Sequence, residues 1–251
     1  MPWTAAPPLV LVGLAVGLLS GLFGVGGGVI AVPALGLLLH LHEHLAQGTS
    51  LAVILPTTAW GTYRYARRGS VRWAASLRMG IPAVVASTLA ARAALHLQGG
   101  LLRIFFAVFL MAVAWRNAAR RDAPPPPPGA NRRLAWIQIA LGTGVGCLAG
   151  LLGVGGGALA TPGLVLLCGF PAQLAQGTSL GALVLAAGAG MSSYAASGSV
   201  VWPAAAAIFA GALATVPLGT QLAHRLPERR LRVAFSLFVL AMALWEIVRQ
   251  L

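Results

Sequence analysis

The stretch GLFGVGGGVIAVP, residues 21–33, recurs as GLLGVGGGALATP at residues 150–162. Each copy contains a glycine triplet and lies inside a long apolar segment. Glycine costs a helix interior about 1 kcal/mol relative to alanine, so a triplet predicts a break in the helix. In lipid, such a break is tolerated only where protein or a water-filled cavity surrounds the freed backbone groups. We therefore interpret this glycine box as part of a binding site.

The composition indicates an integral membrane protein. Of the 251 residues, 58% are hydrophobic and only 8% are charged, whereas soluble domains carry about 25% charged residues. All 17 basic residues are arginines, which cluster in short loops, and the net charge is +13. In a membrane protein such arginines set the topology by the positive-inside rule, so we expect a lipid bilayer as the partner and no nucleic acid.

An internal duplication organises the chain. An offset of 129 residues superimposes the two glycine boxes, and the sequence AQGTSL at 46–51 recurs letter for letter at 175–180. A run of five prolines with flanking arginines separates the copies. We therefore divide the chain into membrane repeat 1 at residues 1–117, a cytoplasmic Pro/Arg-rich linker at 118–133, and membrane repeat 2 at 134–251.

Each repeat contains four apolar segments. In repeat 1 they are residues 9–41, 46–65, 73–95 and 101–115, and in repeat 2 they are 134–168, 174–195, 202–223 and 231–248. The glycine triplet interrupts the first segment of each repeat. We predict an all-α polytopic fold in which each repeat has one re-entrant hairpin, turning at the glycines, and three true transmembrane helices.

The arginines predict that the repeats have inverted topology. The loop at 64–72 has four arginines while its equivalent at 196–201 has none, and the next pair of loops reverses this bias. Placing both arginine-rich loops and the linker in the cytoplasm, together with the neighbouring Arg78 and Arg116, puts 14 of the 17 arginines inside. Both termini are then extracytoplasmic, and the tips of the two hairpins approach each other near the midplane.

Broken helices where inverted repeats meet are typical of secondary transporters with a midplane site. Consecutive glycine N–H groups before a helix form a concavity that attracts anions, and neighbouring amides and hydroxyls add neutral donors. We expect a small anionic substrate to bind at Gly26, Gly27, Gly28, Gln47, Thr49, Ser50, Gly155, Gly156, Gly157, Gln176, Thr178 and Ser179.

Other readings of these residues are weaker. The AQGTSL box could instead cap a helix. Glycines spaced by four, at 17 and 21 and at 142, 146 and 150, indicate close helix packing. His40, His42 and His44 resemble metal ligands, but they occur in one repeat only, so we expect no metal site. The sequence shows no catalytic constellation and no cofactor motif, so we expect neither an enzyme nor a cofactor.

The paired glycine boxes, each followed by Gln-Gly-Thr-Ser-Leu, resemble the TauE/SafE family of sulfite-exporter-like permeases over essentially the whole chain. The resemblance implies export or import of small sulfur-containing anions such as sulfite, sulfoacetate or related organosulfonates across a prokaryotic cytoplasmic membrane. Together with the broken helices, it leads us to expect a secondary transporter that exports such an anion by alternating access. The alternatives are transport of another small anion, such as a carboxylate, and a non-transporting membrane subunit. As a further partner we consider a second copy of the chain, in a homodimer.

Overall fold

The computed structural model describes residues 6–97 and 131–227, together with most of 230–241. Every regular element within these residues is an α-helix, so the predicted all-α class is confirmed there. The predicted helix at 101–115 and residues 118–130 of the linker lie outside the described residues. The predicted helix at 231–248 is described only in part.

The described helices follow the predicted segments closely. Repeat 1 contains α1 (Ala6–Phe23), α2 (Gly28–Leu38), α3 (Glu43–Ala66) and α4 (Trp73–Ala94). Repeat 2 contains α6 (Asn131–Leu152), α7 (Gly157–Cys168), α8 (Ala172–Ala196) and α9 (Trp202–Arg225). Helix α6 begins at Asn131, so the last three residues of the predicted linker are helical.

Four of the described helices are long and apolar enough to cross a membrane, namely α4, α8, α9 and residues 133–152 of α6. The chain is therefore a multi-pass membrane protein. Helix α3 is as long as these four, with 24 residues, but it is not among them because it is more polar: it carries a glutamine and four threonines. We expected α6 to be one arm of a re-entrant hairpin and not a transmembrane helix; its 22 residues extend about 33 Å, which is long enough to cross.

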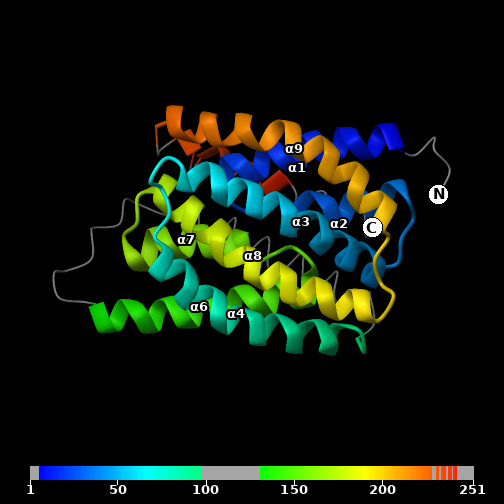
Figure 1. Ribbon diagram of the computed structural model, residues 1–251, viewed down its shortest axis with the longest axis horizontal. Coiled ribbons are helices and arrows are strands. Elements are labelled where there is room, and N and C mark those ends of the chain that lie inside the picture. The colour runs from blue at the N-terminus through cyan, green and yellow to red at the C-terminus, as the bar shows by residue number, and fades with distance from the viewer. Residues whose placement is uncertain are drawn as a thin grey trace.

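The chain reverses direction at each glycine box (Figure 1). Helix α2 runs back along α1, and Gly27 packs against Val16 near the middle of α1. The returning helices are short, with 11 residues in α2 and 12 in α7, or about 17 Å each. The two arms of each hairpin are therefore unequal in length.

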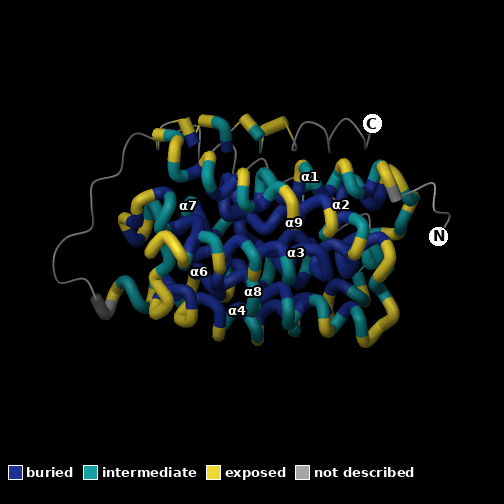
Figure 2. Tube along the Cα trace, turned by 45° about the horizontal axis from the view of Figure 1, so that its top comes forward, coloured by how far each residue is buried: buried dark blue, intermediate teal, exposed yellow. Residues whose placement is uncertain are grey.

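The helices form three layers (Figure 1). One outer layer pairs α1 with α9, and the other pairs α4 with α6. Between them lie α3 and α8, flanked by α2 and α7. Most of the residues in α3 and α8 are buried, whereas the exposed residues gather on the outer helices (Figure 2). The polar AQGTSL boxes thus lie in the most buried layer.

Glycines set the spacing within the outer layers. A Cβ atom at Gly21 would lie 2.5 Å from the carbonyl oxygen of Val216 in α9, and one at Gly150 would collide with the carbonyl of Ser87 in α4. Gly17, Gly142 and Gly146 make similar backbone contacts. The predicted packing role of these four-spaced glycines is confirmed.

The two central helices run antiparallel. Gln47 near the start of α3 contacts Tyr194 near the end of α8, and Gln176 near the start of α8 contacts Tyr65 near the end of α3. The 129-residue offset relates Gln47 to Gln176 and Tyr65 to Tyr194, so the two contacts are equivalent. At one end of the molecule, the side chain of Arg68 reaches Thr220 of α9 and that of Ser70 reaches His224, so the arginine-rich loop at 64–72 lies close to the C-terminal end of α9.

Candidate functional site

The turns between the hairpin arms depend on the first two glycines of each triplet. Gly26 and Gly27 both have φ of 84°, and Gly155 and Gly156 have φ of 80° and 72°. Residues with a side chain adopt this left-handed region only at a cost. The predicted break is confirmed at both boxes, and its conformation explains why glycine is needed there.

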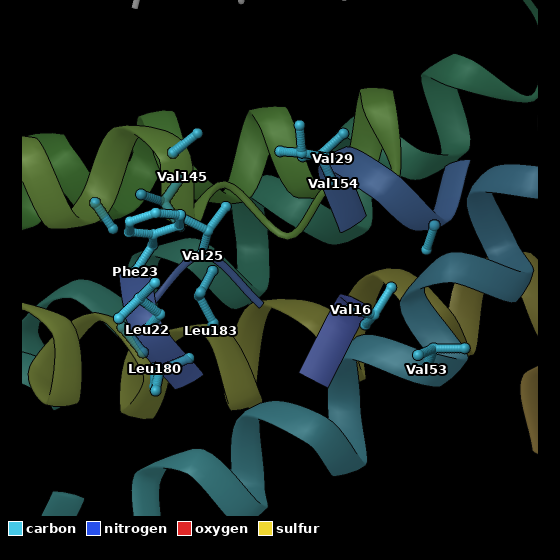
Figure 3. Packing of buried hydrophobic residues seen from close by; sticks show 14 of the residues in the cluster. Val16, Leu22, Phe23, Val25, Val29, Val53, Val145, Val154, Leu180 and Leu183 are labelled. Atoms are coloured by element: carbon cyan, nitrogen blue, oxygen red, sulfur yellow. The ribbon is translucent and has the colours of Figure 1, made fainter. Parts of the chain in front are cut away.

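The third glycine of each triplet is needed for close contact between the two repeats. Gly28 and Gly157 begin α2 and α7. A Cβ atom at Gly28 would lie 2.6 Å from Cα of Val154, and one at Gly157 would lie 2.5 Å from Cα of Val25. The two turns therefore touch in the interior, where Val25 and Val154 join the buried cluster of Figure 3.

The end of α1 leaves carbonyl groups without helical partners, and donors come from Tyr65 of the same repeat and from two side chains of the other repeat. The Tyr65 hydroxyl lies 2.8 Å from the Gly21 oxygen. The Gln176 amide donates to the carbonyl oxygen of Leu22 at 2.9 Å, and the Ser179 hydroxyl donates to that of Gly24 at 3.2 Å. Gln176 and Ser179 belong to the second AQGTSL box, so this box supplies hydrogen-bond donors to the carbonyl groups at the break in the first repeat.

The first AQGTSL box acts in the same way on the second repeat. Ser50 donates to the carbonyl of Gly153 at 2.8 Å, while Tyr194, which contacts Gln47, also lies 2.9 Å from the carbonyl of Gly150. Each box lies beyond the first residue of its own helix, so it does not cap that helix. Instead, it satisfies the C-terminal end of α1 or α6 in the opposite repeat.

Thr49 and Thr178 lie away from the turns. The Thr49 hydroxyl accepts from the N–H of Val201 at 2.9 Å, and the Thr178 hydroxyl accepts from the N–H of Arg72 at 3.0 Å. These threonines fasten the α8–α9 loop and the α3–α4 loop, respectively. The structure thus brings the glycines, glutamines and serines of the predicted site together at the turns, and places the threonines at the two ends of the central layer.

Side chains donate to several of the carbonyl groups at the breaks, whereas the N–H groups of the turns have no such partner among the described residues. Residues 25–28 and 154–157 are buried. Their N–H groups have no acceptor among the residues that the structure describes. A buried N–H without a partner costs roughly 1–3 kcal/mol, and here each group precedes a helix whose dipole adds positive potential. Groups of this kind are suited to donate to an anion.

Charged side chains contribute little to this centre. Every arginine whose side chain the structure describes is at least partly exposed, including Arg78 and Arg92 on α4. Glu43, the one acidic side chain within the described residues, lies at the start of α3. No three His, Cys, Asp or Glu side chains of the described residues are grouped as metal ligands. The centre is built from neutral donors.

Sequence reasoning missed Tyr65 and Tyr194. Both side chains are fully buried, and each contacts the glutamine of the opposite repeat. Their signal was available, because the 129-residue offset superimposes these two residues. The pairing does not by itself indicate a buried role, because a tyrosine near the end of a membrane helix usually marks the membrane interface.

Comparisons with known proteins identify the family to which the chain belongs. Residues 9–245 match the family described as "Sulfite exporter TauE/SafE". The chain is 31% identical to a "Probable membrane transporter protein" of Xylella fastidiosa, over 95% of this chain and 92% of that protein. It is 28% identical to the "Probable membrane transporter protein YunE" of Bacillus subtilis, over 88% of this chain and 89% of that protein. No solved structure matches significantly. The chain is therefore a membrane transporter of the TauE/SafE family.

Proposed function

We propose that the protein is a secondary transporter that exports a small sulfur-containing anion, such as sulfite, sulfoacetate or a related organosulfonate, by alternating access. The observation that carries this proposal is the pair of touching glycine turns, whose buried N–H groups lack acceptors among the described residues. Two helix N-termini meet there, so an anion between them would interact with both dipoles.

The neutral character of the centre suits a transported anion. Hydrogen bonds to a charged group contribute about 1.5–3 kcal/mol each. Several of them can hold an anion in place of its water, yet without a buried arginine the anion is also able to leave. The family description names sulfite, whose three oxygens can accept from donors on both turns.

The inverted arrangement of the repeats forms part of the same proposal. The antiparallel contact of α3 with α8 is what two repeats of opposite orientation would make. The arginine-rich loop at 64–72 lies beside the C-terminal end of α9, where Arg225 is the last residue, and these arginines favour that end as cytoplasmic. The protein would then lie in a prokaryotic cytoplasmic membrane with both termini outside, and the turns near its midplane.

We assign different roles to the backbone groups and to the side chains of the predicted site. The turn glycines would bind the anion through their N–H groups. Gln176, Ser50 and Ser179 would hold the turns in place, because they already donate to carbonyl groups. Alternating access would then require the contacts between each AQGTSL box and the opposite turn to rearrange as a unit.

A binding screen of the purified protein in detergent tests the proposal. Thermal shift and isothermal titration with sulfite, thiosulfate, sulfoacetate, taurine, sulfate and acetate should show saturable binding of at least one sulfur oxyanion, and weaker binding of acetate. Counterflow of the best ligand in proteoliposomes then tests transport. A protein that binds acetate alone would be a carboxylate carrier, and one that binds none of these anions would contradict the proposal.

A further inference from the structure

Ser20 stands out among the buried polar side chains of the described residues. It lies on α1, one helical turn before the glycine break, and is only 1% exposed. Its hydroxyl has no hydrogen-bond partner within the part of the chain that the structure describes. A buried hydroxyl without a partner is unfavourable. A ligand that binds beside Ser20 would supply the missing acceptor.

Other hydroxyls on the helices of this protein behave differently. Thr57, Thr58 and Thr88 each donate to the carbonyl oxygen four residues earlier, at 2.6–2.9 Å. This is the usual way for a helical hydroxyl to be satisfied in an apolar surrounding. The equivalent acceptor for Ser20 would be the carbonyl of Val16, and that bond is absent. The Ser20 proton therefore remains available.

The face of α1 that carries Ser20 points toward the first glycine turn. Ser20 and Val16 share this face because they are four residues apart. A Cβ atom at Gly27 would lie 2.5 Å from the Val16 side chain, so that face packs against the returning chain. Gly24 also donates its N–H to the backbone oxygen of Ser20 at 2.9 Å. Ser20 therefore lies on the face of α1 that packs against the turn, whose N–H groups also lack acceptors among the described residues.

The second repeat has no such hydroxyl. The 129-residue offset converts Ser20 into Ala149. The surroundings are otherwise equivalent, because Val145 packs against Gly156 as Val16 packs against Gly27. The two turns consequently differ in their donors: the first offers N–H groups and a hydroxyl, and the second offers N–H groups only.

We propose that Ser20 is a specificity-determining residue that donates its hydroxyl proton to the substrate anion and makes the first turn the stronger half of the site. This inference rests on the proposed function. The additional donor favours a group with three acceptor oxygens, such as sulfite or a sulfonate, over a carboxylate with two. The anion would therefore bind off-centre, toward repeat 1, although the backbone of the site is nearly symmetric.

The duplication supplies a matched set of variants. Ser20→Ala removes the hydroxyl, Ala149→Ser introduces one at the equivalent position, and the double variant transfers it. Thr215→Val serves as a control, because the Thr215 hydroxyl donates to Leu14 at 2.7 Å in the α1–α9 interface. Isothermal titration with sulfite and with acetate gives the dissociation constants, and thermal unfolding in detergent gives the Tm.

Ser20→Ala should raise the Kd for sulfite by about tenfold or more, the usual effect of losing a hydrogen bond to a charged group. Its Tm should not fall, since the hydroxyl stabilises nothing in the ligand-free protein. The Kd for acetate should change less, and the double variant should recover part of the affinity. Thr215→Val should lower the Tm and leave the Kd unchanged.

Two results would overturn the inference, and they are distinguishable from failure of the proposed function. If the unaltered protein binds sulfite and Ser20→Ala binds it with the same Kd, Ser20 does not contact the anion, while the proposed function stands. If Ser20→Ala loses affinity only together with a lower Tm, Ser20 supports the fold. If the unaltered protein binds no sulfur oxyanion, the proposed function itself fails, and this inference fails with it.

Discussion

The hydroxyl of Tyr65 lies 2.9 Å from Oε1 of Gln176, although the two residues are 111 positions apart and belong to different repeats. The equivalent pair, Tyr194 and Gln47, has the same separation. Each tyrosine also lies within hydrogen-bond distance of a carbonyl at the end of α1 or α6. Two equivalent buried contacts of this kind therefore join the repeats.

Removing either hydroxyl should destabilise the protein. Tyr65→Phe leaves the buried Oε1 of Gln176 and the carbonyl of Gly21 without this donor, at a cost of about 1–3 kcal/mol. Tyr194→Phe should cost a comparable amount because its contacts are equivalent. Thermal unfolding in detergent should show a lower Tm for both. Tyr63→Phe is the control, since that side chain is 49% exposed and its Tm should not change. A wild-type Tm for Tyr65→Phe would show that the contact contributes nothing.

The glycine turns should not tolerate a side chain. Gly27→Ala combines a left-handed φ of 84° with a Cβ atom 2.5 Å from Val16, so we expect transport to be abolished. Gly69→Ala is a matched control, because Gly69 also has a left-handed φ, of 67°, but nothing lies within 4 Å of its added Cβ. It should retain transport. Equal activity of the two variants in proteoliposomes would contradict the role of the turn.

The proposed topology can be tested by labelling. In a background with Cys147→Ala and Cys168→Ala, we place one cysteine at Ser197 or at Gly69, which lie in equivalent exposed loops. In intact cells an impermeant maleimide should label Ser197→Cys and should not label Gly69→Cys until the membrane is permeabilised. Labelling of both positions from outside would exclude the inverted arrangement.

Most of the fold could be predicted because its determinants repeat along the sequence. The apolar segments gave the helix ranges to within a few residues, as for α4, predicted at 73–95 and found at Trp73–Ala94. The glycine triplets located both breaks. The length of α6 was harder to predict, because polar residues at its start resemble a linker, although Asn131 and the two arginines after it are helical.

The partners of the site residues could not be predicted from sequence. The AQGTSL boxes indicated polar groups near the centre, but nothing in their pattern shows that Gln176 and Ser179 satisfy the carbonyl groups of the other repeat. That assignment depends on the antiparallel contact of α3 with α8, which brings together residues more than 100 positions apart. In the tertiary structure, side chains donate to the carbonyl groups at the breaks, while the N–H groups of the turns keep no acceptor among the described residues. This difference depends on the tertiary structure and has no counterpart in the sequence pattern.

The central claim, that an anion binds to the N–H groups of the two turns, can be tested most directly by selective isotope labelling. Valine labelled with ¹³C at its carbonyl and glycine labelled with ¹⁵N give signals only for glycines that follow valine, which are Gly13, Gly17, Gly26, Gly146 and Gly155. Gly26 and Gly155 lie in the turns, whereas the other three pack between helices. Titration with sulfite should shift the Gly26 and Gly155 amide signals saturably and leave the other three in place. Sulfite binding measured by calorimetry without a shift at Gly26 or Gly155 would contradict the claim.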